Sequence, residues 1–151
     1  MIAYVLSFMA KTVRVVIDTN VLVAALLRRE GHNRDALRAC FEDRLTALVG
    51  QALFLDYEDV LGRQQLFRKS PLNVPERCRL LESFLSVCEW VQVYGLWRPN
   101  LRDEDANHIL ELAIVGAASL IVTNNVSDFG ASDLRFPVRI RRPKNLLKEL
   151  P

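Results

Sequence analysis

The sequence contains few of the residues that most often mark a cofactor or a transition-metal site. It has three cysteines and two histidines, and no Cys-x-x-Cys pair. An odd number of separated cysteines suggests no disulfide framework, so a reducing cytoplasm is the simplest compartment. A zinc site is disfavoured because it needs several cysteine or histidine ligands. A metal in this protein would have to be a hard cation held by oxygen atoms.

The chain also lacks a glycine-rich phosphate loop, internal repeats and low-complexity linkers. Nucleotide binding of the P-loop or dinucleotide type is therefore unsupported. Residues 1–10 are mildly apolar without a basic start, which resembles neither a signal peptide nor a membrane-spanning helix. We expect them to form an extension, disordered or non-native, with Met9 as the natural start. Residues 11–151 should then form a single domain.

The charge balance permits nucleic-acid binding without requiring it. The net charge is +2, but the basic residues are clustered. One cluster holds Arg28, Arg29, Arg34 and Arg38, and the other holds Arg135, Arg139, Arg141, Arg142 and Lys144. Each cluster is either a solvated face or a surface that contacts phosphates.

A β-branched apolar run at residues 13–17 ends abruptly in Asp18, Thr19 and Asn20. Val and Ile favour the packed interior of a sheet, so the run predicts a buried strand. Open α/β sheets place their ligand crevices at the carboxyl ends of central strands. The alternative is that Asp18 or Asn20 only caps the following helix.

Apolar spacing predicts an alternation of strands and helices along the chain. Strands are expected at residues 13–17, 46–49, 90–94, 119–123 and around 138–140. Helices are expected at 21–29, 34–44 (capped by Asn33), 51–62, 75–88 and 107–116, briefly within 64–74, and after Pro143. This alternation predicts an α/β fold with three layers, α/β/α, around a mostly parallel central sheet.

Acids and amides gather at points that such a fold would bring together. Asp18 and Asn125 follow strands, the run Asp103-Glu104-Asp105 precedes a helix, and Asp56 lies within a helix. Two carboxylates about 5 Å apart repel by roughly 3 kcal/mol at an effective dielectric of 20. A gathered set therefore needs a cation, and Mg²⁺ or Mn²⁺ accepts carboxylate, amide and water oxygens. Metal-assisted phosphodiester hydrolysis fits such an acid-only site best.

Four stretches, in this order, resemble PIN-domain proteins of the branch of VapC-like toxins from toxin–antitoxin systems. They are Ile17 to Leu22, Leu55 to Leu61, Arg102 to Ala113 and Ile121 to Phe129. The resemblance spans roughly residues 13 to 143, nearly the whole chain. It implies an Mg²⁺- or Mn²⁺-dependent ribonuclease that is cytoplasmic, often homodimeric, held inactive by a cognate antitoxin and not associated with membranes.

The resemblance carries over residue by residue with some departures. Asp18 matches the first metal-binding acid, while Asp56 stands where the family usually has glutamate, one methylene longer. The third acid position is Ala106, with Asp105 beside it and Asp103 upstream. We expect catalytic roles for Asp18, Asp56, Asp103 and Asp105, metal ligation by Asp18, Asp56, Asp105 and Asn125, and support from Thr19, Asn20, Thr123 and Asp128.

The departures leave other interpretations open. One residue on a helix is about 100° of rotation, so Asp105 replaces the acid missing at Ala106 only if the helix start is irregular. Asp103 and Asp105 also fit an N-cap and a first helical turn, and Asp128 fits a turn. The chain is then a catalytically weakened module that binds RNA or a partner. A phosphotransfer enzyme with Asp18 as nucleophile is disfavoured, since position 20 is asparagine.

Overall fold

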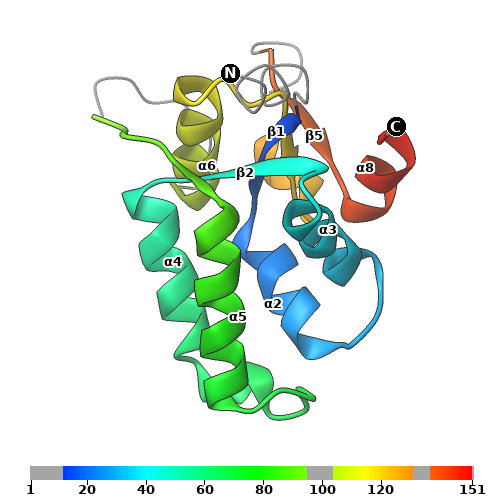
Figure 1. Ribbon diagram of the computed structural model, residues 1–151. Coiled ribbons are helices and arrows are strands. Elements are labelled where there is room, and N and C mark those ends of the chain that lie inside the picture. Colours follow the sequence, from blue (N-terminus) through cyan, green and yellow to red (C-terminus); the bar gives the residue numbers. More distant parts are fainter. Residues whose placement is uncertain (1–11, 95–103, 131–136, 151) are drawn as a thin grey trace, which may run out of the picture.

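A parallel sheet of five strands forms the centre of the computed structural model, which describes residues 12–94, 104–130 and 137–150 (Figure 1). The strands are β1 (Val13–Ile17), β2 (Leu45–Val49), β3 (Glu89–Trp90), β4 (Leu120–Val122) and β5 (Arg139–Arg141). They lie in the order β3-β2-β1-β4-β5, and every neighbouring pair is parallel. The expected residues 1–10 extension and the loop at 95–100 lie outside the described residues.

The strand order reverses at the centre of the sheet. From β1 the chain adds β2 and β3 on one side, and then β4 and β5 on the other. The crevice between β1 and β4, at their carboxyl ends, is therefore the topological switch point, where open α/β sheets bind ligands. Val15, Val16 and Ile17 of β1 have no exposed surface, as expected for a central strand covered on both faces.

Helices cover both faces of the sheet, which confirms the predicted three-layer α/β/α architecture (Figure 1). Helix α6 packs against β1, β2 and β4, whereas α3 and α5 pack against β2 and α8 packs beside α3. The helices are α2 (Thr19–Leu27), α3 (His32–Phe41), α4 (Gln51–Leu61), α5 (Val74–Val87), α6 (Glu104–Val115) and α8 (Pro143–Glu149), with 3-10 turns η1 (Gln64–Phe67) and η2 (Val126–Phe129). None of the helices in the described part of the chain is long and apolar enough to span a membrane.

Most differences from the predicted elements lie at their ends. Helix α2 begins at Thr19 because Asp18 is its N-cap, and α6 begins three residues before the expected Asn107. The predicted cap at Asn33 is wrong, since α3 begins at His32 with Gly31 as its N-cap. A φ of 125° at Gly31 allows the earlier start, because glycine adopts such angles readily.

The strand expected at residues 90–94 is much shorter in the structure. Strand β3 ends at Trp90, after which the N–H of Val91 donates to the carbonyl of Val49. Strand β2 also ends at Val49, and Gly50 starts the turn into α4. Beyond Val91 none of the described strands pairs with this segment, although Val91 and Val93 are partly buried and alternate with exposed residues. Strand β5 is displaced by one residue from the predicted 138–140.

Candidate active site

Asp18 and Thr123 lie side by side at the switch point. Ile17 and Val122 are register partners at the ends of β1 and β4, so the next residue on each strand meets the other. The N–H of Asp18 donates to the Val122 carbonyl at 2.9 Å. The Thr123 hydroxyl, which is fully buried, donates to Oδ2 of Asp18 at 2.8 Å. The sheet thus sets both the position and the orientation of the Asp18 carboxylate.

The two residues after Asp18 also hold its carboxylate. The N–H of Thr19 donates to Oδ1 at 2.7 Å, and the amide of Asn20 donates to Oδ2 at 3.2 Å. The same Asn20 amide lies 3.2 Å from the Thr123 hydroxyl. Asp18 therefore does cap α2, as the simpler interpretation expected, but it also belongs to a side-chain network that a cap does not need. Thr19, Asn20 and Thr123 all touch the carboxylate or its partner.

Burial shifts the pKa of the Asp18 carboxyl group. Desolvation raises the pKa of this carboxyl, the hydrogen bonds from Thr123 and Thr19 lower it, and the negative charge of Asp128 raises it further. In the described part of the chain no basic side chain forms an ion pair with Asp18. A buried carboxylate without a counter-charge favours binding of a cation at its open side.

Asparagines extend this network along the edge of the sheet. Oδ1 of Asn20 accepts from the N–H of Asn124 at 3.0 Å, and the Asn124 amide donates to Oδ1 of Asn33 at 2.8 Å. The Arg142 guanidinium donates to the Asn124 carbonyl. Asn33, Asn124 and Arg142 had no predicted role in the site. The Asn124-Asn125 pair directly after a strand was a sequence signal for Asn124 alone.

Asn125 and Asp128 lie just beyond this network. The Asn125 side chain is exposed, and its backbone N–H donates to the Thr123 hydroxyl at 3.0 Å. Asn125 caps η2, whose first turn contains the exposed Asp128. The turn interpretation of Asp128 thus fits its local structure. Its charge also acts on Asp18, so Asp128 lies within electrostatic range of the site.

The remaining acids are brought together only in part. Asp56 is half-buried on α4, next to the fully buried Tyr57. Desolvation raises the pKa of Tyr57 most, and the negative charges of Asp18 and Asp56 raise it further. The Tyr57 hydroxyl donates to the carbonyl of Ile17, the residue before Asp18. Tyr57 thus ties α4 to the end of β1, a contact that its apolar periodicity alone did not predict.

The third acid position stays a prediction. Asp103 and the side chain of Asp105 lie outside the described residues, whereas Ala106 is buried, with 3% of its surface exposed. Among the described side chains no three histidine, cysteine, aspartate or glutamate residues are close enough to hold a metal. The proposed ligand set of Asp18, Asp56, Asp105 and Asn125 therefore depends on Asp105.

Four members of the basic clusters make internal contacts in the described part of the chain. Arg34 donates from Nε to the Ala25 carbonyl of α2, and Arg38 pairs with Asp35. Arg141 pairs with Glu149, while Arg142 reaches Asn124 at the site. Among the described members of these clusters, Arg142 contacts the network around Asp18 through the Asn124 carbonyl.

The sequence model of the PIN domain family matches residues 14–127, which is most of the chain and includes β4 and nearly all of β1, the strands that carry the site. The chain belongs to the PIN domain family. Members of this family are generally metal-dependent nucleases. No curated protein matches this PIN domain in sequence.

Two solved structures resemble this PIN domain. VapBC2 from Rickettsia felis, bound to a DNA fragment from its promoter, matches with a TM-score of 0.54 at 19% identity, over 85% of this chain and 97% of that one. PAE2754 from Pyrobaculum aerophilum matches with a TM-score of 0.47 at 16% identity, over 93% and 90% of the two chains. At this identity the first match supports the fold alone.

Proposed function

We propose that this PIN domain is a metal-dependent endoribonuclease that hydrolyses RNA phosphodiester bonds and acts as the toxin of a toxin–antitoxin pair. The observation that supports this proposal most directly is the buried carboxylate of Asp18 at the switch point. Thr123 orients this carboxylate, and no described basic residue neutralises it. Family membership supports nuclease chemistry at this edge of the sheet.

The chemistry of the donors suits a hard divalent cation. Asp18 offers carboxylate oxygens, and the nearby side chains contribute hydroxyl and amide oxygens. A cation would offset the desolvation that raises the pKa of Asp18. We propose that Asp18, Asp56, Asp105 and Asn125 hold Mg²⁺ or Mn²⁺. Bound there, such an ion lowers the pKa of a water molecule and stabilises charge on the phosphate.

The chain itself contributes orientation and positioning. Thr123, Thr19 and Asn20 fix the rotamer of Asp18 through the bonds described above, so its geometry is set before substrate binds. In this proposal Asp56 of α4 contributes a further carboxylate, and Asp103 and Asp105 add more negative charge to the site. Arg142, held beside the site through Asn124, contacts the RNA backbone.

The proposed partners follow the family assignment. The structure from Rickettsia felis contains a VapBC complex, which supports a cognate antitoxin as partner of this chain. A homodimer in the cytoplasm is the corresponding proposal for the free toxin. The second candidate is a PIN domain that binds RNA or a partner without cutting, and the buried Ala106 in place of the third acid favours it.

Cleavage of a panel of RNA substrates in Mg²⁺ or Mn²⁺, with and without EDTA, tests the proposal. We expect the wild type to cut and Asp18→Asn to lose at least about 10³-fold in rate, because the carboxylate would contact the metal. Asp59→Asn is the matched control, since Asp59 is exposed and pairs only with Arg63 on the described surface.

Circular dichroism of both variants separates loss of chemistry from loss of fold. Unchanged cleavage by a folded Asp18→Asn variant would overturn the proposal. Mn²⁺ binding without cleavage of any substrate, by the antitoxin-free wild type, would favour the non-catalytic candidate.

A further inference from the structure

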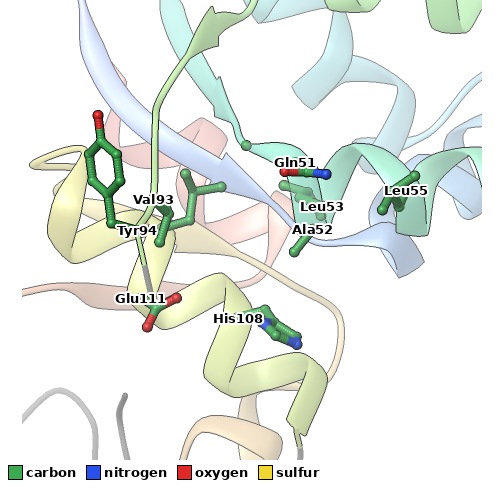
Figure 2. Close-up of a pocket in the computed structure, with 10 residues that line it drawn as sticks. Gln51, Ala52, Leu53, Leu55, Val93, Tyr94, His108 and Glu111 are labelled. Carbon is green, nitrogen blue, oxygen red and sulfur yellow. The ribbon is translucent and has the colours of Figure 1, made fainter. Parts of the chain in front are cut away.

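A cavity lies between α4 and α6, with a volume of about 350 Å³. Figure 2 shows Gln51, Ala52 and Leu55 on α4 and His108 and Glu111 on α6, and Tyr94 also lines the cavity. This volume lies within the range of pockets that bind small molecules. Asp56 lies on the same helix as the lining residues Ala52 and Leu55, about one turn after Ala52.

Glu111 supplies an unusual acceptor in the wall of this pocket. Its side chain lies on α6 and only 6% of the residue is exposed. Its Oε2 atom is buried and has no hydrogen-bond partner among the residues that the structure describes. Leaving a buried acceptor unsatisfied destabilises a fold by about 1–3 kcal/mol, so such groups often mark a ligand. A partner for this carboxylate must donate hydrogen bonds.

The start of α4 supplies donors to the same pocket. Gly50 is the N-cap of this 11-residue helix and makes no side-chain cap, and Gly50, Gln51 and Ala52 all line the cavity. A Cβ at Gly50 would lie 3.2 Å from the Val91 carbonyl oxygen, so packing disfavours a capping side chain there. The first amides of a helix point outward without intrahelical partners and carry partial positive charge.

These two groups together define the ligand. Its donors must face Glu111 and its acceptor must face the α4 amides, and its apolar faces must suit Leu53 and Leu55. A phosphate would be repelled by Glu111, and a guanidinium offers no acceptor to α4. A flat, neutral group with adjacent donors and acceptor meets all three demands. Tyr94, with 77% of its surface exposed, offers a ring on which such a group can stack.

We propose that this pocket binds a guanine base. Guanine places two N–H donors, N1–H and the N2 amino group, beside the acceptor O6, and the other bases lack this combination. That the base belongs to an RNA nucleotide near the cleaved bond rests on the proposed nuclease function. Glu111 is then a residue that determines sequence specificity, outside the acid site itself.

Binding of nucleoside monophosphates in EDTA tests this inference without any cleavage. Titration of GMP, AMP, CMP and UMP against the ¹⁵N-labelled wild type should show the tightest binding for GMP. The amide signals of Gln51 and Ala52 should move. Because all four probes share the phosphate, the difference between them measures recognition of the base. Glu111→Gln should weaken GMP binding by about 10- to 100-fold, since a charged acceptor is lost.

Glu82→Gln makes the same chemical change on the exposed side of α5 and should bind GMP like the wild type. Equal binding of the four nucleotides, or GMP binding unchanged by Glu111→Gln, would overturn the inference. So would tighter binding of an arginine-containing peptide at the same amide signals, which would assign the pocket to a protein partner. Selective GMP binding without RNA cleavage would refute the nuclease proposal while the guanine site stands.

Discussion

The Thr123 hydroxyl donates to Oδ2 of Asp18 at 2.8 Å, joining two residues that are 105 positions apart in the chain. The same hydroxyl oxygen accepts from the backbone N–H of Asn125 and lies near the Asn20 amide. One buried hydroxyl thus connects the ends of β1 and β4 with the turn that follows.

Thr123→Val tests that connection because valine keeps the shape and removes the hydroxyl. It leaves Oδ2 of Asp18 and the Asn125 N–H each without one partner in a buried region. We expect the free energy of unfolding to fall by about 1–3 kcal/mol, measured by urea denaturation. Mn²⁺ affinity should fall as well, because the orientation of Asp18 is lost.

Thr123→Ser is the matched control, since it keeps the hydroxyl and should preserve Mn²⁺ affinity. If valine and serine gave the same Mn²⁺ affinity as the wild type, Thr123 would have a structural role only. A loss of stability in the serine variant alone, with normal metal affinity, would indicate that the methyl group of Thr123 matters instead.

Mn²⁺ should raise the thermal midpoint of the wild type. A ligand at 100 times its dissociation constant stabilises the native state by about 2.7 kcal/mol. For a domain of this size that corresponds to roughly 5–10 °C, measured by calorimetry with and without EDTA. Asp18→Asn should lose most of the shift and Asp59→Asn none of it. Equal shifts in all three proteins would place the ion elsewhere.

Ala106→Asp restores an acid at the family's third position but puts it at a site with 3% exposure. We expect the free energy of unfolding of the metal-free variant to be roughly 2–4 kcal/mol lower than that of the wild type, because a carboxylate is buried without a partner. If the introduced carboxylate reaches the metal, saturating Mn²⁺ should recover much of this loss.

Ala117→Asp is its control, since Ala117 is exposed and has a φ of 56°, which aspartate tolerates. Its stability should stay within about 0.5 kcal/mol of the wild type. An Ala106→Asp variant that is as stable as this control without metal would contradict the burial argument.

The thiols give a prediction about pH. Burial raises the pKa of Cys40 and of Cys88 to about 12, and the charge of Cys40 adds to the effect on Cys88. Ordinary thiols titrate near 9.0, so the unfolded chain releases these protons first as the pH rises. The stability that the two thiols contribute is fully present below pH 9 and is lost progressively towards pH 12. Urea unfolding at pH 8 and pH 10 measures this loss.

Cys78 is exposed and should react alone with a disulfide reagent in the native protein at pH 8. Cys40 and Cys88 should react only after unfolding. Cys78→Ala should remove the fast phase completely. Fast reaction of two or more thiols in the folded protein would show that Cys40 or Cys88 is more accessible than the structure indicates.

The buried strands and the class of the fold followed from the sequence alone. Residues 15–17 and 47–49 are apolar at consecutive positions because both faces of the sheet are covered there. Helix ends were less accurate. Gly31 accounts for the early start of α3, but its role as N-cap comes from a backbone angle that no side-chain pattern specifies.

The structure brings Asp18, Thr19, Asn20 and Thr123 together at one edge of the sheet, because each lies at or just after the end of a strand. Asn33, Asn124, Tyr57 and Arg142 were not predicted to join them. Their contacts depend on helix packing and on strand order, which local spacing does not encode. The same limit applies to the pocket of Glu111. In the sequence this residue cannot be distinguished from an exposed glutamate on a helix.

The sequence by itself determined which segments become buried strands and which polar residues end them, because burial and capping are local preferences of side chains. Only the tertiary structure decided that β1 and β4 are neighbours, that the strand order reverses between them, and that Thr123 therefore meets Asp18. The physical reason is that strand pairing across the chain is set by the packing of helices on both faces, which involves all the layers at once.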